Sequence, residues 1–154
     1  MRALIQRVTS ASVYVDDSSV GEIGIGLLVL IGIKNGDKET DVEYVVDKTT
    51  NLRIFPDNEG KFDKSVSDVG GSVLLVSQFT LYSNTRKGRR PSFTEAMPPE
   101  EAKDMFDAVT KAFEDTGVSV QRGIFRSQMQ VNLVNDGPVT IMIDSEDRNT
   151  SRSS

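Results

Sequence analysis

The chain has 154 residues, of which 37% are hydrophobic and 27% charged, and it contains neither cysteine nor histidine. This length and composition suit one globular domain that needs no disulfide or metal staple. The lack of cysteine excludes a disulfide framework and a thiolate zinc site. The lack of histidine removes the usual general base and the commonest transition-metal ligand. We therefore expect no metal and no cofactor, and any catalysis must proceed without imidazole or thiol.

The charge pattern is acidic overall but basic in one place. The 18 basic and 23 acidic residues give a net charge of −5, which does not favour nucleic-acid binding through bulk attraction. Four cations nevertheless lie close together, with no acidic residue between positions 81 and 94: Arg86, Lys87, Arg89 and Arg90. This run, called the basic loop below, is either a solvated loop or a contact site for phosphates.

The N-terminal segment, residues 1–7, lacks the long apolar run of a signal peptide. No later run approaches the roughly 20 apolar residues of a membrane span. The sequence therefore predicts a cytoplasmic protein with no membrane partner.

The first half of the chain reads as strands followed by one helix. Strands are predicted over residues 4–8, 12–15, 21–23 and 27–33, the last of them apolar on both faces and therefore central in a sheet. A helix is then predicted with Thr40 and Glu43 as its capping box. Its apolar face holds Val42, Val45, Val46 and Thr49.

The second half contains the other helix and the remaining strands. Residues 73–77 again form a strand that is apolar on both faces. The helix follows Pro98, carries acidic residues in its first turn and ends at Gly117. Its apolar face holds Ala102, Met105, Phe106, Val109, Ala112 and Phe113. Strands over residues 118–121, 129–134 and 139–143 complete the pattern, and the alternation in 129–134 indicates one wetter face.

Together these elements predict an α+β fold with a single domain over residues 1–144 and a polar, flexible tail over 145–154. Two helices are too few to cover all of the apolar surface that the predicted strands present. A second copy of the chain is therefore expected to cover part of the sheet.

Three stretches carry the polar residues that suit a site. The first is Ser77, Gln78, Phe79 and Thr80, where an apolar strand ends and presents hydroxyl, amide and main-chain N–H groups at the sheet edge. A hydroxyl nucleophile needs a base within hydrogen-bond reach, and no histidine is available. These residues either play a structural part at the strand end or supply N–H donors to a developing oxyanion.

The second stretch, residues 135–138, consists of turn formers, and its ordinary interpretation is a turn that joins two strands. Proline after Gly137 raises the chance of a cis peptide to about 5–6%. The third stretch is the basic loop with Phe93 after it, a side chain that either stacks on a base or anchors the loop.

Several segments, taken in order, resemble the D-aminoacyl-tRNA deacylase family, formerly called D-tyrosyl-tRNA deacylase. They are Leu4-Ile5-Gln6-Arg7-Val8, Gly26-Leu27-Leu28-Val29-Leu30, Arg53-Ile54-Phe55, Gly70-Gly71-Ser72-Val73, Ser77-Gln78-Phe79-Thr80-Leu81, Arg90-Pro91-Ser92-Phe93 and Asn135-Asp136-Gly137-Pro138-Val139-Thr140. The match spans residues 1–144, and the segments at 77–81 and 135–140 look like the family's signature motifs.

The resemblance implies a cytoplasmic homodimer with a β-barrel-like or strongly curved mixed sheet covered by two main helices. Its substrate would be aminoacyl-tRNA, held by the 3′-terminal aminoacyl-adenosine at the subunit interface. Ser77, Gln78, Phe79 and Thr80 would form the catalytic site, with Met129 lining the pocket. A cis Gly137–Pro138 peptide would reach into the neighbouring subunit and reject L-amino acids. The basic-loop cations would contact the tRNA.

The resemblance leaves several alternatives open. Either Thr80 is a nucleophile or the adenosine 2′-hydroxyl assists cleavage, and a chain without histidine favours the latter. Arg126 departs from the family, which usually has two small residues after the phenylalanine. Some relatives are linked to DNA replication origins, so a nucleic-acid-binding module is the second hypothesis, although only about ten polar residues follow Asp144. A small dimeric interaction protein without catalysis is the third.

Overall fold

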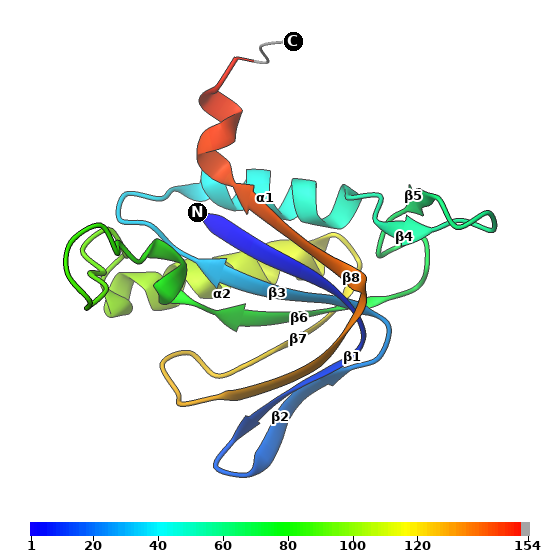
Figure 1. The fold of residues 1–154 in the computed structure, drawn as a ribbon, viewed down its shortest axis with the longest axis horizontal. Coiled ribbons are helices and arrows are strands. Elements are labelled where there is room, and N and C mark those ends of the chain that lie inside the picture. Colours follow the sequence, from blue (N-terminus) through cyan, green and yellow to red (C-terminus); the bar gives the residue numbers. More distant parts are fainter. Residues whose placement is uncertain (152–154) are drawn as a thin grey trace.

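The two longest strands, β1 (Arg2–Val15) and β8 (Gln130–Asp144), run antiparallel along one another although they lie at opposite ends of the sequence (Figure 1). The computed structural model describes residues 1–151. On its other edge β1 pairs antiparallel with β3 (Gly26–Gly32) and then with β2 (Ser18–Ile23). Strand β1 is long enough to pair with β3 along its first part and with β2 along its second part. These strands and β8 form the antiparallel part of the sheet.

The other half of the sheet is parallel. Strand β6 (Ser72–Ser77) pairs with β3, and β7 (Ser119–Arg122) pairs with β6. Strand β2 also contacts β6 and β7, which brings the two edges of the sheet close together. The result is a nearly closed, barrel-like mixed sheet, so the predicted α+β fold with a strongly curved sheet is confirmed.

The central strands face a core on both sides, as predicted. Leu27, Val29 and Ile31 of β3 belong to a cluster that includes residues of both helices, whereas Leu28 belongs to a second cluster inside the curved sheet. The alternation follows from the strand, in which successive side chains point to opposite faces. Both helices therefore cover one face of the sheet.

The helices are α1 (Glu39–Asn51) and α2 (Pro99–Asp115), and the predicted apolar face of each is confirmed by the buried residues of the helix. The predicted capping box of α1 is wrong. The N–H of Lys38 donates to the Asp41 carboxylate at 2.8 Å, because α1 begins at Glu39 and Asp41 occupies its third position.

The predicted turn at residues 135–138 is also wrong, since these residues lie within the continuous strand β8. Gln6 pairs with Thr140 and Val8 with Asn135, so residues 136–139 bulge outward opposite the single residue Arg7. The strands predicted over 4–8 and 12–15 likewise form one strand, β1. Turn-forming residues were consistent with a bulge as well as with a turn.

Smaller elements complete the fold. Strands β4 (Phe55–Pro56) and β5 (Phe62–Lys64) form a hairpin, and the 3-10 helix η1 (Phe79–Tyr82) follows β6. A second 3-10 helix, η2 (Ser145–Asn149), occupies the start of the predicted tail. Ser145 is fully buried, and its N–H donates to the Met1 carbonyl at 2.8 Å, so packed contacts continue past Asp144. The end of that tail, 152–154, lies outside the described residues.

Within residues 1–151, no helix has both the length and the apolar composition that a membrane crossing requires.

Candidate active site

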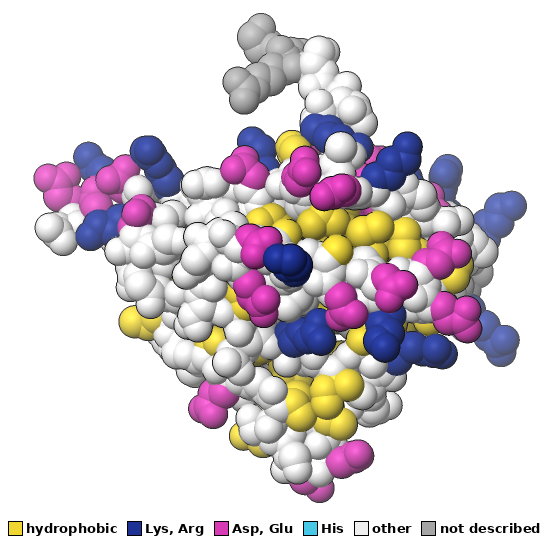
Figure 2. All heavy atoms as spheres, turned by 180° about the vertical axis from the view of Figure 1, so that it is seen from behind, with side chains coloured by type: hydrophobic (Ala, Val, Ile, Leu, Met, Phe, Trp, Pro, Cys, Tyr) yellow, Lys and Arg dark blue, Asp and Glu magenta, His cyan; other side chains and the backbone are white. Residues whose placement is uncertain are grey.

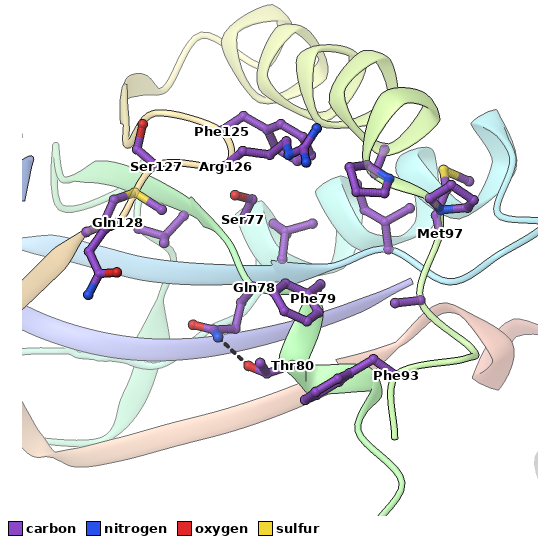
Figure 3. A pocket seen from close by; sticks show the side chains of 18 of the residues that line it. Ser77, Gln78, Phe79, Thr80, Phe93, Met97, Phe125, Arg126, Ser127 and Gln128 are labelled. Atoms are coloured by element: carbon purple, nitrogen blue, oxygen red, sulfur yellow. Dashed lines mark hydrogen bonds between the residues drawn. The ribbon is translucent and has the colours of Figure 1, made fainter. Parts of the chain in front are cut away.

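An open pocket of about 860 Å³ lies where β6 ends (Figure 3). Its walls come from β6 and η1, from the loop between β7 and β8, and from the start of α2. The lining residues are Ile31, Ile33, Val76, Ser77, Gln78, Phe79, Thr80, Phe93, Ala96, Met97, Pro98, Pro99, Ala102, Phe125, Arg126, Ser127, Gln128, Met129 and Val131. The structure thus brings together Ser77, Gln78, Phe79, Thr80 and Met129, all of which were predicted site residues.

The strand-end residues divide into two sides of the pocket. Ser77 lies toward the loop that carries Phe125 and Arg126, whereas Gln78 and Thr80 lie on the other side of the strand end (Figure 3). The Gln78 amide nitrogen donates to the Thr80 hydroxyl oxygen. This bond orients Thr80, whose hydroxyl has no carboxylate or imidazole beside it among the lining residues.

The first turn of η1 presents main-chain donors. The Gln78 N–H is occupied by the Ile31 carbonyl at 2.7 Å, and the Leu81 N–H donates to the Gln78 carbonyl at 3.2 Å. Phe79 and Thr80 lie between them as the first two residues of η1, so their N–H groups have no acceptor within the helix. Adjacent N–H groups of this kind suit an oxygen that gains negative charge.

Two residues of the neighbouring strands hold η1 against the sheet. A β-carbon on Gly32 would lie 2.8 Å from that of Leu81, so η1 packs on β3 only because Gly32 lacks a side chain. Arg2 donates to the Leu81 carbonyl at 2.8 Å, and its guanidinium carbon lies 4.5 Å from the centre of the Tyr82 ring. Burial raises the pKa of the Tyr82 phenol. The Tyr82 hydroxyl is therefore neutral, and the buried side chain packs in the interior rather than acting as a base.

The opposite wall is the loop between β7 and β8. Phe125 packs its ring 6.0 Å from that of Phe106 in α2, which ties the loop to the helix layer. The Ser127 N–H donates to the Ile124 carbonyl at 3.2 Å and closes a turn in which Arg126 has a φ of +65°. Arg126 is the only charged side chain among the lining residues.

The remaining wall was not predicted as part of the site. Met97, Pro98, Pro99 and Ala102 bring the start of α2 to the pocket. The sequence predicted where this helix begins, but only the packing of α2 beside β6 and β7 shows that its beginning faces the strand end.

The basic loop lies next to the pocket without lining it. Asn84 and Ser92 pair at its base, with N–H to carbonyl distances of 2.7 and 2.9 Å, and the loop's four cations are exposed. Phe93 packs edge-on against Phe79 at 5.0 Å, so it joins the loop to the pocket rim. Basic side chains gather at the end of the molecule that holds this loop, at the right in Figure 2.

Gly137 and Pro138 lie elsewhere, on the exposed bulge of β8, and do not line the pocket of their own chain. The peptide between them is cis. Asn135 closes the bulge, accepting the Val139 N–H at 2.7 Å and donating to the Val139 carbonyl at 3.1 Å. The buried Arg7 donates to the carbonyls of Asp136 at 2.9 Å and Ile54 at 2.7 Å.

No role for Arg7 was predicted from the sequence. The signal was a charged residue within an apolar strand, since a buried guanidinium must find acceptors. Its acceptors, however, lie far away in the sequence.

Fold and pocket together define a class of protein: a curved-sheet domain with an open pocket at a strand end and neither imidazole nor thiol among the residues that line it. Residues 4–144 match the family model described as D-Tyr-tRNA(Tyr) deacylase. The chain therefore belongs to this family.

Named relatives agree with this assignment. The D-aminoacyl-tRNA deacylase of Desulfitobacterium hafniense is 55% identical, over 95% of this chain and 98% of its own length. That of Carboxydothermus hydrogenoformans is 52% identical, over 94% and 99%. A solved structure named c-Myc DNA Unwinding Element Binding Protein is 41% identical with a TM-score of 0.88, over 94% and 98%. A probable eukaryotic D-amino acid tRNA deacylase, with a TM-score of 0.80 over 93% and 98%, shares the fold at 19% identity.

Proposed function

We propose that this protein is a hydrolase that cleaves the ester bond between a D-amino acid and the 3′ end of its tRNA. The observation that carries the proposal is that Phe79 and Thr80, whose N–H groups have no acceptor within η1, line a pocket beside an exposed basic loop. An ester carbonyl at the strand end would meet these donors, while RNA phosphates would meet the loop. High identity to curated D-aminoacyl-tRNA deacylases supports the same activity.

In this proposal the RNA assists cleavage of the ester bond that joins it to the amino acid. The lining residues include hydroxyls but no carboxylate, and the chain has no histidine, so neither Ser77 nor Thr80 has an evident base. The 2′-hydroxyl of the terminal adenosine lies next to the ester in the substrate itself. The protein's part is to hold the carbonyl and to stabilise the oxyanion as water adds and the ester C–O bond breaks.

Chiral selection is assigned to the bulge of the partner subunit in a homodimer. Gly137 and Pro138 lie exposed on the outer side of β8, away from their own pocket, where a second copy of the chain can receive them. Their carbonyls would exclude an L side chain without recognising any particular D side chain. Glycine has no side chain to exclude, so glycyl-tRNA is a further substrate of the same site.

The direct test is release of amino acid from D-tyrosyl-tRNA and L-tyrosyl-tRNA at equal enzyme concentration. We expect rapid release from the D form and release from the L form at the uncatalysed rate. Equal rates for both forms, or none for either, would contradict the proposal.

The catalytic group is tested by single-turnover rates. Thr80→Ala should keep most of its rate, whereas a 2′-deoxy terminal adenosine should abolish cleavage. The reverse pattern would identify Thr80 as the nucleophile.

Binding of DNA is the second candidate function, and the name of the 41% identical solved structure is what favours it. The basic loop offers the same cations to either nucleic acid. If single-stranded DNA of matched length binds as tightly as D-tyrosyl-tRNA and no amino acid is released, this second function replaces the first.

A further inference from the structure

Arg126 is a cation for which residues 1–151 provide no partner. Among the residues that line the pocket it is the only charged one, and its side chain is exposed. Across residues 1–151 its guanidinium makes neither a hydrogen bond nor an ion pair with another side chain, whereas Arg122 pairs with Asp107 and Arg148 with Asp41. In Figure 3 it extends from the loop between β7 and β8 beside Phe125, over the strand end that carries Ser77.

The backbone at this position favours a different residue. Arg126 has a φ of +65°, and the other non-glycine residues with positive φ in the described chain are Asp16 and Asp17 in the turn between β1 and β2. Aspartate tolerates the left-handed region because its short side chain bonds locally, whereas arginine has no such compensation. The conformation carries a steric cost for arginine that glycine at the same position would not have. A long cation is therefore kept at a structural cost.

The surroundings suit an anion that enters from outside. A guanidinium binds phosphate or carboxylate oxygens through two parallel N–H donors. No carboxylate lines the pocket, so nothing within it competes for Arg126. Phe125 lines the same pocket and adds apolar surface beside Arg126, as a nucleoside next to a phosphate would require.

We infer that Arg126 binds the phosphate of the terminal adenosine and so positions the RNA end over the strand end, an inference that rests on the proposed function. The phosphate is favoured over an acidic amino-acid side chain because every substrate of this class carries it. Arg126 is thus a substrate-binding residue, and it occupies a position whose backbone conformation favours glycine.

The experiment compares adenosine 5′-monophosphate with adenosine as ligands of the wild type and of Arg126→Lys, Arg126→Gln and Arg126→Gly. The wild type should bind the monophosphate roughly ten-fold more tightly, which corresponds to one charge-assisted hydrogen bond. Arg126→Gln and Arg126→Gly should lose this preference, and Arg126→Lys should keep part of it. Lys111→Gln, which removes a cation from an exposed ion pair on α2, serves as the control and should behave as the wild type.

Thermal unfolding separates binding from folding. Arg126→Gly should raise the melting temperature while it weakens monophosphate binding, and a purely structural role cannot produce this combination. Retention of the monophosphate preference by Arg126→Gln would overturn the inference.

The two anion sources are separated with charged tRNAs. If Arg126→Gln slows release from D-tyrosyl-tRNA and D-aspartyl-tRNA equally at sub-saturating substrate, the phosphate is supported. If Arg126→Gln slows release only from D-aspartyl-tRNA, the guanidinium binds the amino-acid side chain and the inference fails. If the wild type releases neither amino acid, the proposed function itself is wrong, whatever the result of the adenosine 5′-monophosphate binding experiment.

Discussion

At the scale of single residues, Arg7 shows how one buried charge shapes a distant surface. Its guanidinium is held by the carbonyls of Asp136 and Ile54, and it lies opposite the bulge that carries Gly137. A β-carbon on Gly137 would lie 3.2 Å from an Arg7 nitrogen, so the bulge packs tightly on this side chain. The exposed position of Gly137 and Pro138 therefore depends on an interaction in the interior.

Replacing Arg7 by alanine should lower the free energy of unfolding by about 1.5–3 kcal/mol, because two carbonyls lose a charged donor. Urea denaturation measures the change. Arg53→Ala is the matched control, since Arg53 pairs with Asp63 at an exposed site, and its effect should stay below about 1 kcal/mol. Equal losses in the two variants would show that Arg7 does not hold the bulge.

Asp41 is the second residue whose environment decides its chemistry. Burial alone would raise its pKa, but hydrogen bonds from Ser145, from the Lys38 N–H and from Arg148 outweigh burial and lower the pKa from 3.8 to about 2. The same carboxylate thus caps α1 and holds η2.

Because its folded-state pKa is lower than its unfolded one, Asp41 stabilises the fold fully above about pH 4, and this contribution is lost as the pH falls through about 2. Between pH 4 and pH 2 the unfolding free energy of the wild type should fall more steeply than that of Asp41→Asn. Asp115→Asn, at the exposed pair with Lys111, is the control and should follow the wild type. Parallel curves for wild type and Asp41→Asn would contradict the assignment.

At the scale of elements, the site depends on the contact between η1 and β3. Leu81 and the Gln78 carbonyl approach Gly32 so closely that any side chain there must displace η1, together with the N–H groups of Phe79 and Thr80. The geometry of the proposed oxyanion site is therefore set by a glycine in the neighbouring strand.

Gly32→Ala should destabilise the protein by about 1–3 kcal/mol and lower the deacylation rate on D-tyrosyl-tRNA by at least ten-fold, since η1 must move. Melting temperature and single-turnover rate are measured together. Gly24→Ala is the control, because its added β-carbon meets nothing within 4 Å. A Gly32→Ala enzyme with full activity would show that η1 does not position the reacting group.

At the scale of the whole molecule, the acidic chain carries four of its 18 basic side chains close together in the basic loop. Arg89→Gln combined with Arg90→Gln should weaken tRNA binding and make the affinity fall less steeply as the salt concentration rises. On a single strand, the slope should decrease by about 0.7 for each phosphate that the variant no longer neutralises. Binding measured between 50 and 200 mM salt tests this. An unchanged slope would place the tRNA-binding surface elsewhere.

The proposed dimer belongs to the same scale. Val134 and Met142 are exposed on β8, on either side of the bulge that carries Gly137 and Pro138, and an apolar strand face of this kind suits a second subunit. Sedimentation of the wild type should give twice the 16.9 kDa chain mass. Met142→Glu should shift the equilibrium toward monomer and reduce chiral selectivity with it. A wild type that sediments as a monomer would remove the cross-subunit part of the proposal.

The sequence by itself determined the features that depend on the periodicity of side chains within one element. The burial of β3 and β6, the extent of α2 and the apolar face of α1 follow from side chains within one element. The strand-end motif at 77–80 was also visible, because an apolar run stops there at polar residues.

Only the tertiary structure decided the bulge and the pocket. From the sequence alone Asn135 and Pro138 indicate a turn, whereas in the structure β1, from the opposite end of the chain, pairs along β8 on both sides of them. The pocket joins β6, the start of α2 and the loop before β8, and its one cation comes from a residue whose backbone favours glycine. Register and packing arise between segments far apart in the chain, so no local pattern of residues contains them.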